Sequence, residues 1–146
     1  MNDILNGRIE VVSIDSSNAE GITEFLEIAK TAKASFRYFE SRPLTIIEHH
    51  KATYLVRLDN QYVGYGHLDY ENEIVWLGIA IADDYQGLGL AKVIMSTLVS
   101  TAKLQKLRQI RLSVDQDNIR AIKLYDDFGF KVVKKSGDIQ FMEKEL

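Results

Sequence analysis

Residues 79–91 read Ile-Ala-Ile-Ala-Asp-Asp-Tyr-Gln-Gly-Leu-Gly-Leu-Ala, and they join the expected central strand to the longest expected helix. An apolar strand predicted over 73–82 ends in a short acidic loop, and a segment with two glycines then opens a long helix. The first backbone N–H groups of a helix have no partner within it, and the helix dipole adds about half a positive charge there. Because Gly87 and Gly89 carry no Cβ, a phosphate can approach these N–H groups closely. The stretch therefore predicts an anion site; the alternative is a turn that uses glycine only for its backbone freedom.

Apolar spacing predicts the other elements. A buried central strand, a hairpin before it and amphipathic helices between later strands indicate an α/β (α+β) fold built on a mixed sheet. Without a repeat or a Gly/Ser-rich stretch to divide the chain, we expect a single domain over residues 1–146. The expected segments are strands at 8–14, 52–58, 61–68, 73–82, 109–114 and two around 136–138, helices at 22–29, 41–51, 90–106 and 118–128, and turns at 59–60 and 70–72.

Composition excludes several classes of function. The 146 residues include no cysteine, which removes disulfides, thiolate metal sites and a cysteine nucleophile. A net charge of −3, spread without long blocks, disfavours nucleic acid as a partner. The amino terminus lacks the pattern of a signal peptide, and no apolar run approaches the roughly 20 residues of a membrane span. We therefore expect a cytoplasmic protein that does not enter a membrane.

Two nucleotide-binding motifs and a metal site are not supported by the sequence. The dinucleotide fingerprint needs Gly or Ala where Lys92 stands, and no P-loop pattern occurs. His49 and His50 are adjacent and His67 is distant in sequence, so they lack the spacing of metal ligands. We expect no metal, and we expect these histidines at the surface.

Two motifs carry a resemblance to a known family. Gln86-Gly87-Leu88-Gly89-Leu90-Ala91 resembles the acyl-CoA-binding motif of the GNAT superfamily of N-acetyltransferases, and the stretch from Asn118 to Phe130 resembles that family's helix with Asn, Ala, Leu-Tyr and Gly-Phe. The resemblance implies a largely antiparallel sheet of about seven strands, flanked by about four helices and splayed at its central parallel pair. It implies acetyl-CoA as co-substrate.

The resemblance assigns roles to particular positions. It places the backbone of Ile79 and Ile81 beside the pantetheine arm and the pyrophosphate on the six residues of the first motif. Asn118 would hydrogen-bond the cofactor arm, although an N-cap of the following helix is an equally good reading. Tyr125 would face the thioester sulfur, where a phenol of pKa about 10 can give a proton to the departing thiolate. The alternative for Tyr125 is an aromatic on the core face of its helix.

A proton acceptor is also needed, because a protonated amine has no lone pair with which to attack a thioester. Glu73, at the expected start of the central strand, resembles the carboxylate of several family members; the alternative is a solvated charge at a turn. In other branches the base stands where this chain has Ser113, and serine cannot act as that base. Asp115 or water then remains as the acceptor.

The acceptor pocket of such proteins is formed mostly by the first two helices and the loop between them. Phe36 and Tyr38, in the cluster Phe-Arg-Tyr-Phe, could form its wall, or the cluster could fill the core. The resemblance implies acetyl transfer to a primary amine of a small molecule such as an amino sugar, a polyamine or an antibiotic. Alternatives are a protein N-terminal or lysine acetyltransferase and a non-catalytic acyl-CoA-binding module. A homodimer is the general expectation for small soluble enzymes.

Overall fold

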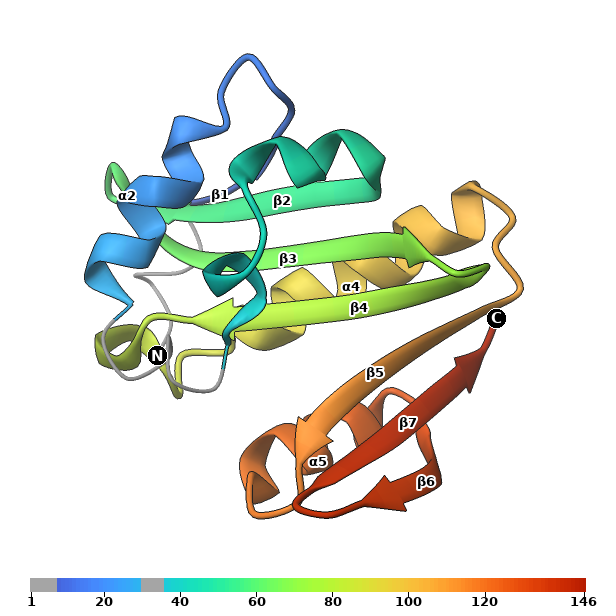
Figure 1. The fold of residues 1–146 in the computed structure, drawn as a ribbon. Helices are drawn as coiled ribbons and strands as arrows, with labels where there is room; N and C mark the ends of the chain where they lie inside the picture. The colour runs from blue at the N-terminus through green and yellow to red at the C-terminus, as the bar shows by residue number, and fades with distance from the viewer. Residues whose placement is uncertain (1–7, 30–35) are drawn as a thin grey trace.

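The structure is a computed structural model that describes residues 8–29 and 36–146, so most of the segment examined for a signal peptide lies outside it. Figure 1 shows the helices packed around one twisted sheet. In chain order the elements are β1 (Ile9–Ser13), α2 (Glu20–Ile28), the 3₁₀ helices η1 (Tyr38–Glu40) and η2 (Leu44–His49), β2 (His50–Leu58), β3 (Gln61–Glu71), β4 (Ile74–Ile81), the 3₁₀ helix η3 (Asp83–Tyr85), α4 (Leu90–Leu104), β5 (Gln109–Asp115), α5 (Ile119–Asp127), β6 (Lys131–Ser136) and β7 (Ile139–Glu145).

Within the described residues, seven strands form one mixed sheet in the order β1-β2-β3-β4-β5-β7-β6. The central pair β4–β5 is parallel and the other neighbouring pairs are antiparallel. This arrangement confirms the predicted fold class.

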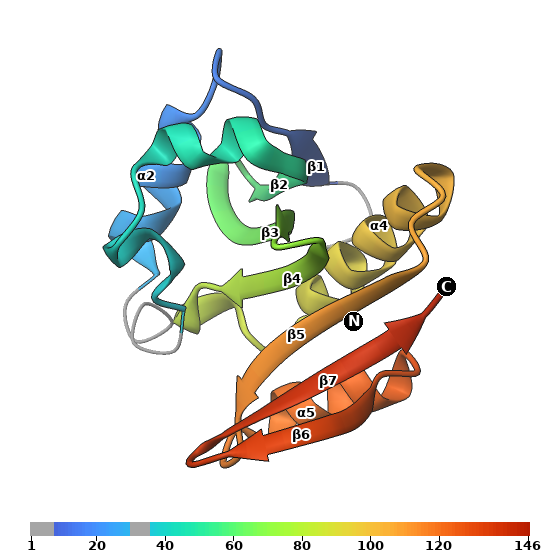
Figure 2. The ribbon, with the colours of Figure 1, turned by 45° about the vertical axis from the view of Figure 1, so that its right-hand side comes forward.

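The parallel pair is joined at one point. In the described chain, Trp76 of β4 is in register with Arg111 of β5, and no further pair follows. Figures 1 and 2 both show the two strands moving apart toward their carboxyl ends. The edge of β4 beyond Trp76 therefore carries backbone groups that β5 does not pair, and such groups need another partner. The expected splay is confirmed.

Apolar side chains pack on both faces of the sheet. Phe25 of α2 packs with Tyr65 on one face, and Ile94 of α4 lies in the larger core on the other, which α5 shares. Gly66 of β3 lets α4 approach closely, since a Cβ at this position would lie 2.3 Å from Ile94 Cγ2. These two layers place β3 and β4 between helices.

The hairpin turns differ in part from expectation. Asp59 and Asn60 turn with φ of 51° and 68°, which confirms the turn predicted there. The turn expected at 70–72 lies instead at Asn72 and Glu73, with φ of 54° and 66°. Consequently β3 runs three residues further than expected, to Glu71, and Glu73 does not open β4.

The helix expected over 41–51 was wrong in type and length. The chain forms a 3₁₀ helix from Leu44 to His49, and Pro43 precedes it in an extended conformation without a side-chain cap. His50 already pairs with Asp69 across β2 and β3, so sheet pairing replaces the last helical turn. The central strand was also expected to be buried on both faces, but Trp76 and Ile79 remain partly exposed.

Candidate active site

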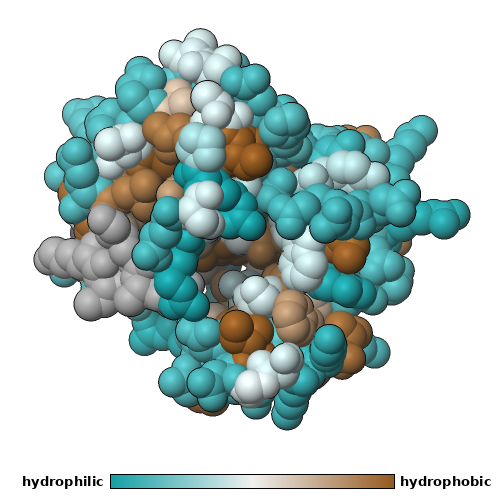
Figure 3. Space-filling view, viewed as in Figure 1, coloured by the Kyte–Doolittle hydropathy of each residue, from teal (hydrophilic) through white to brown (hydrophobic). Residues whose placement is uncertain are grey.

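A cavity of about 740 Å³ occupies the space between the splayed strands. Figure 3 shows this face of the molecule hollowed between the part built by β1–β4 and the part built by β5–β7. The cavity is lined from five directions: the segment around η1, the end of β3, β4, the amino terminus of α4, and β5 with α5. Residues far apart in sequence thus meet in one space.

The amino terminus of α4 opens into this cavity. Gly89 is the N-cap residue, with φ of 86°, and Gly87 has φ of 82°. A Cβ built on either glycine would find no described atom within 4 Å. No side chain caps α4, so its first N–H groups are available to a ligand. Among the six motif residues the cavity is lined by all except Leu88, namely Gln86, Gly87, Gly89, Leu90 and Ala91.

The free edge of β4 forms the middle of the cavity. Ile79 and Ile81 both line it, as expected for an extended ligand that runs along this strand. The side-chain amide of Gln86 donates to the Ile81 carbonyl oxygen at 3.3 Å, which ties the start of the glycine segment to the end of the strand. The residues around the cavity can therefore hold an anionic group at α4 and a chain with amide groups along β4.

Tyr125 of α5 lines the far wall. Its side chain is 8% exposed, and burial raises its pKa to about 12, so the phenol is protonated at neutral pH. The hydroxyl makes no hydrogen bond to any residue in the described ranges and is not sealed from solvent. The N-cap reading of Asn118 is correct, since its Oδ1 accepts from the Ala121 N–H at 3.2 Å. Asn118 also lines the cavity, and its contact with a cofactor stays a prediction.

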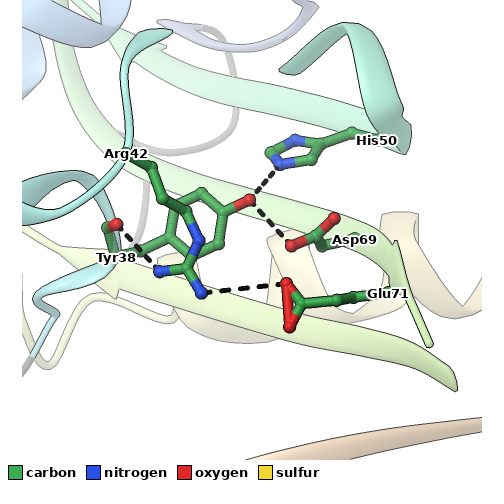
Figure 4. A network of polar contacts seen from close by, with 5 residues as sticks. All are labelled: Tyr38, Arg42, His50, Asp69 and Glu71. Atoms are coloured by element: carbon green, nitrogen blue, oxygen red, sulfur yellow. Dashed lines mark hydrogen bonds and ion pairs between the residues drawn. The ribbon is translucent and has the colours of Figure 1, made fainter. Parts of the chain in front are cut away.

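Phe36 and Tyr38 line the end of the cavity nearest β3. Their rings stack with centroids 6.2 Å apart, and the Tyr38 hydroxyl donates to Asp69 Oδ2 at 2.8 Å. The same hydroxyl lies 2.7 Å from His50 Nε2, and Nδ1 of that ring lies 2.8 Å from Thr53 Oγ1. Figure 4 shows Tyr38 between the His50 ring and the Asp69 carboxylate.

A second polar pair stands beside this chain of hydrogen bonds. The Arg42 guanidinium lies 4.2 Å from the centroid of the Tyr38 ring and donates to the Tyr38 carbonyl oxygen at 3.1 Å. Nη2 of Arg42 lies 3.9 Å from Glu71 Oε2. Figure 4 marks this ion pair with a dashed line. This end of the cavity therefore combines two carboxylates with an aromatic face that is already in contact with a cation.

His50 and His67 were expected at the surface, but His50 is partly buried and His67 is buried. His67 is 3% exposed, and its Nδ1 lies 2.7 Å from the Tyr65 hydroxyl. The rings of His50 and His67 are 4.7 Å apart, because β2 and β3 bring them together. Burial lowers the pKa of His50 to about 4 and that of His67 well below its usual value, so both rings are neutral at neutral pH.

The predicted proton acceptors are divided by the structure. Glu73 lies exposed in the turn and is not among the residues that line the cavity, whereas Asp115 lines it, as does Ser113, which cannot itself act as the base. Sequence reasoning did not select Asp69 or Glu71. The available signal was the alternation Tyr-x-His-x-Asp-x-Glu over 65–71, which places four polar side chains on one face of a strand.

The described ranges contain neither a metal-binding cluster nor a membrane-spanning helix. No group of three or more His, Asp or Glu side chains there is arranged to hold a metal ion. Among the helices of residues 8–29 and 36–146, none combines the length and the apolar character that a bilayer crossing needs.

Comparisons with known proteins agree with this geometry. Residues 19–130 match the model of the Acetyltransferase (GNAT) family. Over 85 residues the chain is 40% identical to a spermine/spermidine N(1)-acetyltransferase of Bacillus subtilis (strain 168), a match that covers 53% of this chain and 54% of that protein. The chain thus spans about half the length of the curated relatives it matches.

Solved structures show the same fold. The PaiA N-acetyltransferase from Thermoplasma acidophilum, in complex with coenzyme A, is 18% identical with a TM-score of 0.75, over 94% of this chain and 99% of that one. The ribosomal-protein-S18-alanine N-acetyltransferase from Escherichia coli is 18% identical with a TM-score of 0.74, over 94% and 93%. Because the family model matches most of the sequence and the fold agrees, this chain belongs to the GNAT acetyltransferase family.

Proposed function

We propose that the chain transfers an acetyl group from acetyl-CoA to a primary amine of a small, positively charged molecule. The observation that carries this proposal is the single cavity that runs from the open amino terminus of α4, along the free edge of β4, to the acidic and aromatic end at Tyr38. The end at α4 suits an anion and the end at Tyr38 suits a cation. Tyr125 of α5 lies on the wall that β5 and α5 form.

The residues present fit coenzyme A. The N–H groups of residues 87–91 would hold the pyrophosphate, because both glycines leave the approach open and the helix dipole favours negative charge; the Gln86 N–H already donates to the Asp83 carbonyl oxygen. The backbone of Ile79 and Ile81 would pair with the amides of the pantetheine arm. Bound acetyl-CoA supplies an activated acetyl group as its thioester. The protonated hydroxyl of Tyr125 would then give its proton to the thiolate that leaves.

The acceptor end favours an amine with positive charge. The carboxylates of Asp69 and Glu71 line it, and Phe36 and Tyr38 supply aromatic surface beside them. The curated relative named for spermine and spermidine supports a polyamine as the acceptor, although it shares only about half of its length with this chain. Amino sugars and other cationic metabolites have the same kind of ammonium group.

An amine panel tests the proposal. Purified protein would be incubated with acetyl-CoA and spermidine, spermine, an amino sugar or a lysine peptide, and free thiol and acetylated product would be measured. We expect turnover with a small polycation and much less with the peptide. Preference for the peptide would transfer the function to protein acetylation. Saturable coenzyme binding without turnover on any amine would indicate a non-catalytic module.

A further inference from the structure

The acceptor ammonium must lose a proton before its nitrogen can attack. An alkylammonium such as that of lysine has a pKa of about 10.4, so almost all of it is protonated at neutral pH. The proton acceptor must therefore lie in the cavity at the acceptor end. The following inference rests on the proposed function and names the residue that performs this step.

Asp69 is a buried carboxylate with one occupied and one free oxygen. It is 4% exposed, lines the cavity, and stands opposite Trp76, where β4 and β5 begin to separate. Oδ2 accepts from Tyr38, while Oδ1 accepts no hydrogen bond from any residue of the described ranges. No fully buried side-chain oxygen in those ranges lacks a partner, so Oδ1 is not fully buried, and Asp69 is one of the residues that line the cavity. A ligand in the cavity can reach this atom.

The hydrogen positions around Oδ2 follow from counting donors. Tyr38 has one hydroxyl hydrogen and donates it to Asp69, so the contact of Tyr38 with His50 needs a hydrogen on Nε2. A neutral ring then has a bare Nδ1, which accepts from the Thr53 hydroxyl. Thr53, His50 and Tyr38 thus donate in series toward one oxygen of Asp69. This chain fixes the orientation of the carboxylate and leaves Oδ1 without a hydrogen bond from any residue of the described ranges.

Charged and titratable groups surround Asp69 from several elements. Tyr38 and Arg42 face it from the segment before η2, His50 from β2, and His67 and Glu71 from β3 itself. Arg42 forms its ion pair with Glu71, and no cation of the described ranges forms one with Asp69. A buried carboxylate that no cation of residues 8–29 and 36–146 pairs is costly, and an incoming ammonium would supply such a partner.

We infer that Asp69 is the catalytic proton acceptor and that Tyr38 and His50 are positioning residues that hold it. The N–H bond of the ammonium breaks, its electron pair stays on nitrogen, and the proton joins Asp69 Oδ1. The neutral amine then attacks the thioester carbonyl, the C–S bond breaks, and the thiolate takes a proton from Tyr125. The attacking nitrogen loses its second proton as the amide forms; this proton restores the Tyr125 hydroxyl through solvent, and Asp69 releases its own proton to solvent. Glu73 lies in the exposed turn and does not line the cavity, so it is not placed to take this proton.

The first test compares Asp69→Asn with Asp59→Asn. Asp59 is also an aspartate next to β3, but it lies in the exposed turn at the other end of that strand. With spermidine and acetyl-CoA, Asp69→Asn should lower kcat/KM on the order of 10²- to 10⁴-fold at neutral pH, with coenzyme affinity unchanged. The loss should shrink as the pH approaches the pKa of the amine, because solution then supplies the neutral form. Asp59→Asn should behave like the wild type.

A second pair of variants tests the positioning residues. Tyr38→Phe keeps the ring and removes the donor, so the acidic limb of the pH profile should move to higher pH. His50→Phe should act in the same direction, and His50→Gln, whose amide can donate to Tyr38, should restore part of the rate. If Tyr38 and His50 had only a structural role, these variants would change the rate or the stability without moving the acidic limb of the pH profile.

The outcomes separate the two proposals. A wild type that turns over no amine would remove the proposed function and this inference with it. Turnover in the wild type with an unchanged rate and pH profile in Asp69→Asn would overturn the inference alone. If Asp69→Asn does not fold, as judged by circular dichroism, the position of the acidic limb in Tyr38→Phe decides: a limb at the wild-type pH would overturn it.

Discussion

Replacing Gly89 by alanine tests the anion site at the amino terminus of α4. Gly89 has φ of 86°, and a Cβ there would project into space where no described atom lies within 4 Å. Two effects follow from one methyl group. The backbone conformation becomes strained, and the methyl group stands where the pyrophosphate is proposed to approach.

The structure offers a matched control for the strain. Gly137, in the turn between β6 and β7, has φ of 59° and equally open surroundings, but it does not line the cavity. Alanine in the left-handed region costs about 1–2 kcal/mol at either position. Only Gly89→Ala should also weaken a hydrogen bond to the charged phosphate, which is worth roughly 1.5–3 kcal/mol, or about a 10- to 100-fold loss of affinity.

Calorimetric titration with coenzyme A and denaturant unfolding measure the two effects separately. We expect both variants to lose similar unfolding free energy and only Gly89→Ala to lose affinity. Equal affinity in the two variants would refute the placement of the phosphate.

Three further predictions concern other parts of the molecule. Tyr125→Phe should lower kcat on the order of 10²-fold with little change in coenzyme affinity, and wild-type turnover would remove its role as proton donor. Gly66→Ala should destabilise the protein by about 1–3 kcal/mol in urea unfolding, since its Cβ would meet Ile94 at 2.3 Å; an unchanged midpoint would mean that α4 shifts freely. The pKa of His50 is lowered to about 4 in the folded protein, so as the pH drops the imidazole is protonated in the unfolded chain before it is protonated in the folded one. The free energy of unfolding should therefore fall by roughly 2 kcal/mol between pH values of about 6.5 and about 4. His50→Gln should flatten that slope, and a slope equal to that of the wild type would contradict the assignment.

The sequence predicted the elements whose signals are local. The apolar spacing of α2, α4 and α5 and the turn residues Asp59-Asn60 are local patterns, and the structure has these elements near the expected bounds. The segment 41–51 was misassigned because pairing between β2 and β3 captures His50, which helical spacing alone does not reveal. The turn before β4 was placed too early for a related reason, since Glu71 still pairs with Ile74 in the sheet.

The site could be predicted only where backbone groups and sequence motifs define it. The glycine segment and Tyr125 line the cavity and were selected from the motifs. Asp69 and His50 were not selected because only the register of the β2–β3 pairing brings them together. The turn at Asn72 and Glu73 also keeps Asp69 within the strand. Long-range pairing of this kind leaves only a weak period-two signal in the chain.

The central claim is that coenzyme A lies between β4 and β5 with its pyrophosphate on the amino terminus of α4. A crystal structure of the protein with coenzyme A measures this directly. The account predicts phosphate oxygens within hydrogen-bond distance of the N–H groups of residues 87–91 and the pantetheine arm against Ile79 and Ile81. Coenzyme bound at another face, with this cavity filled only by water, would contradict it.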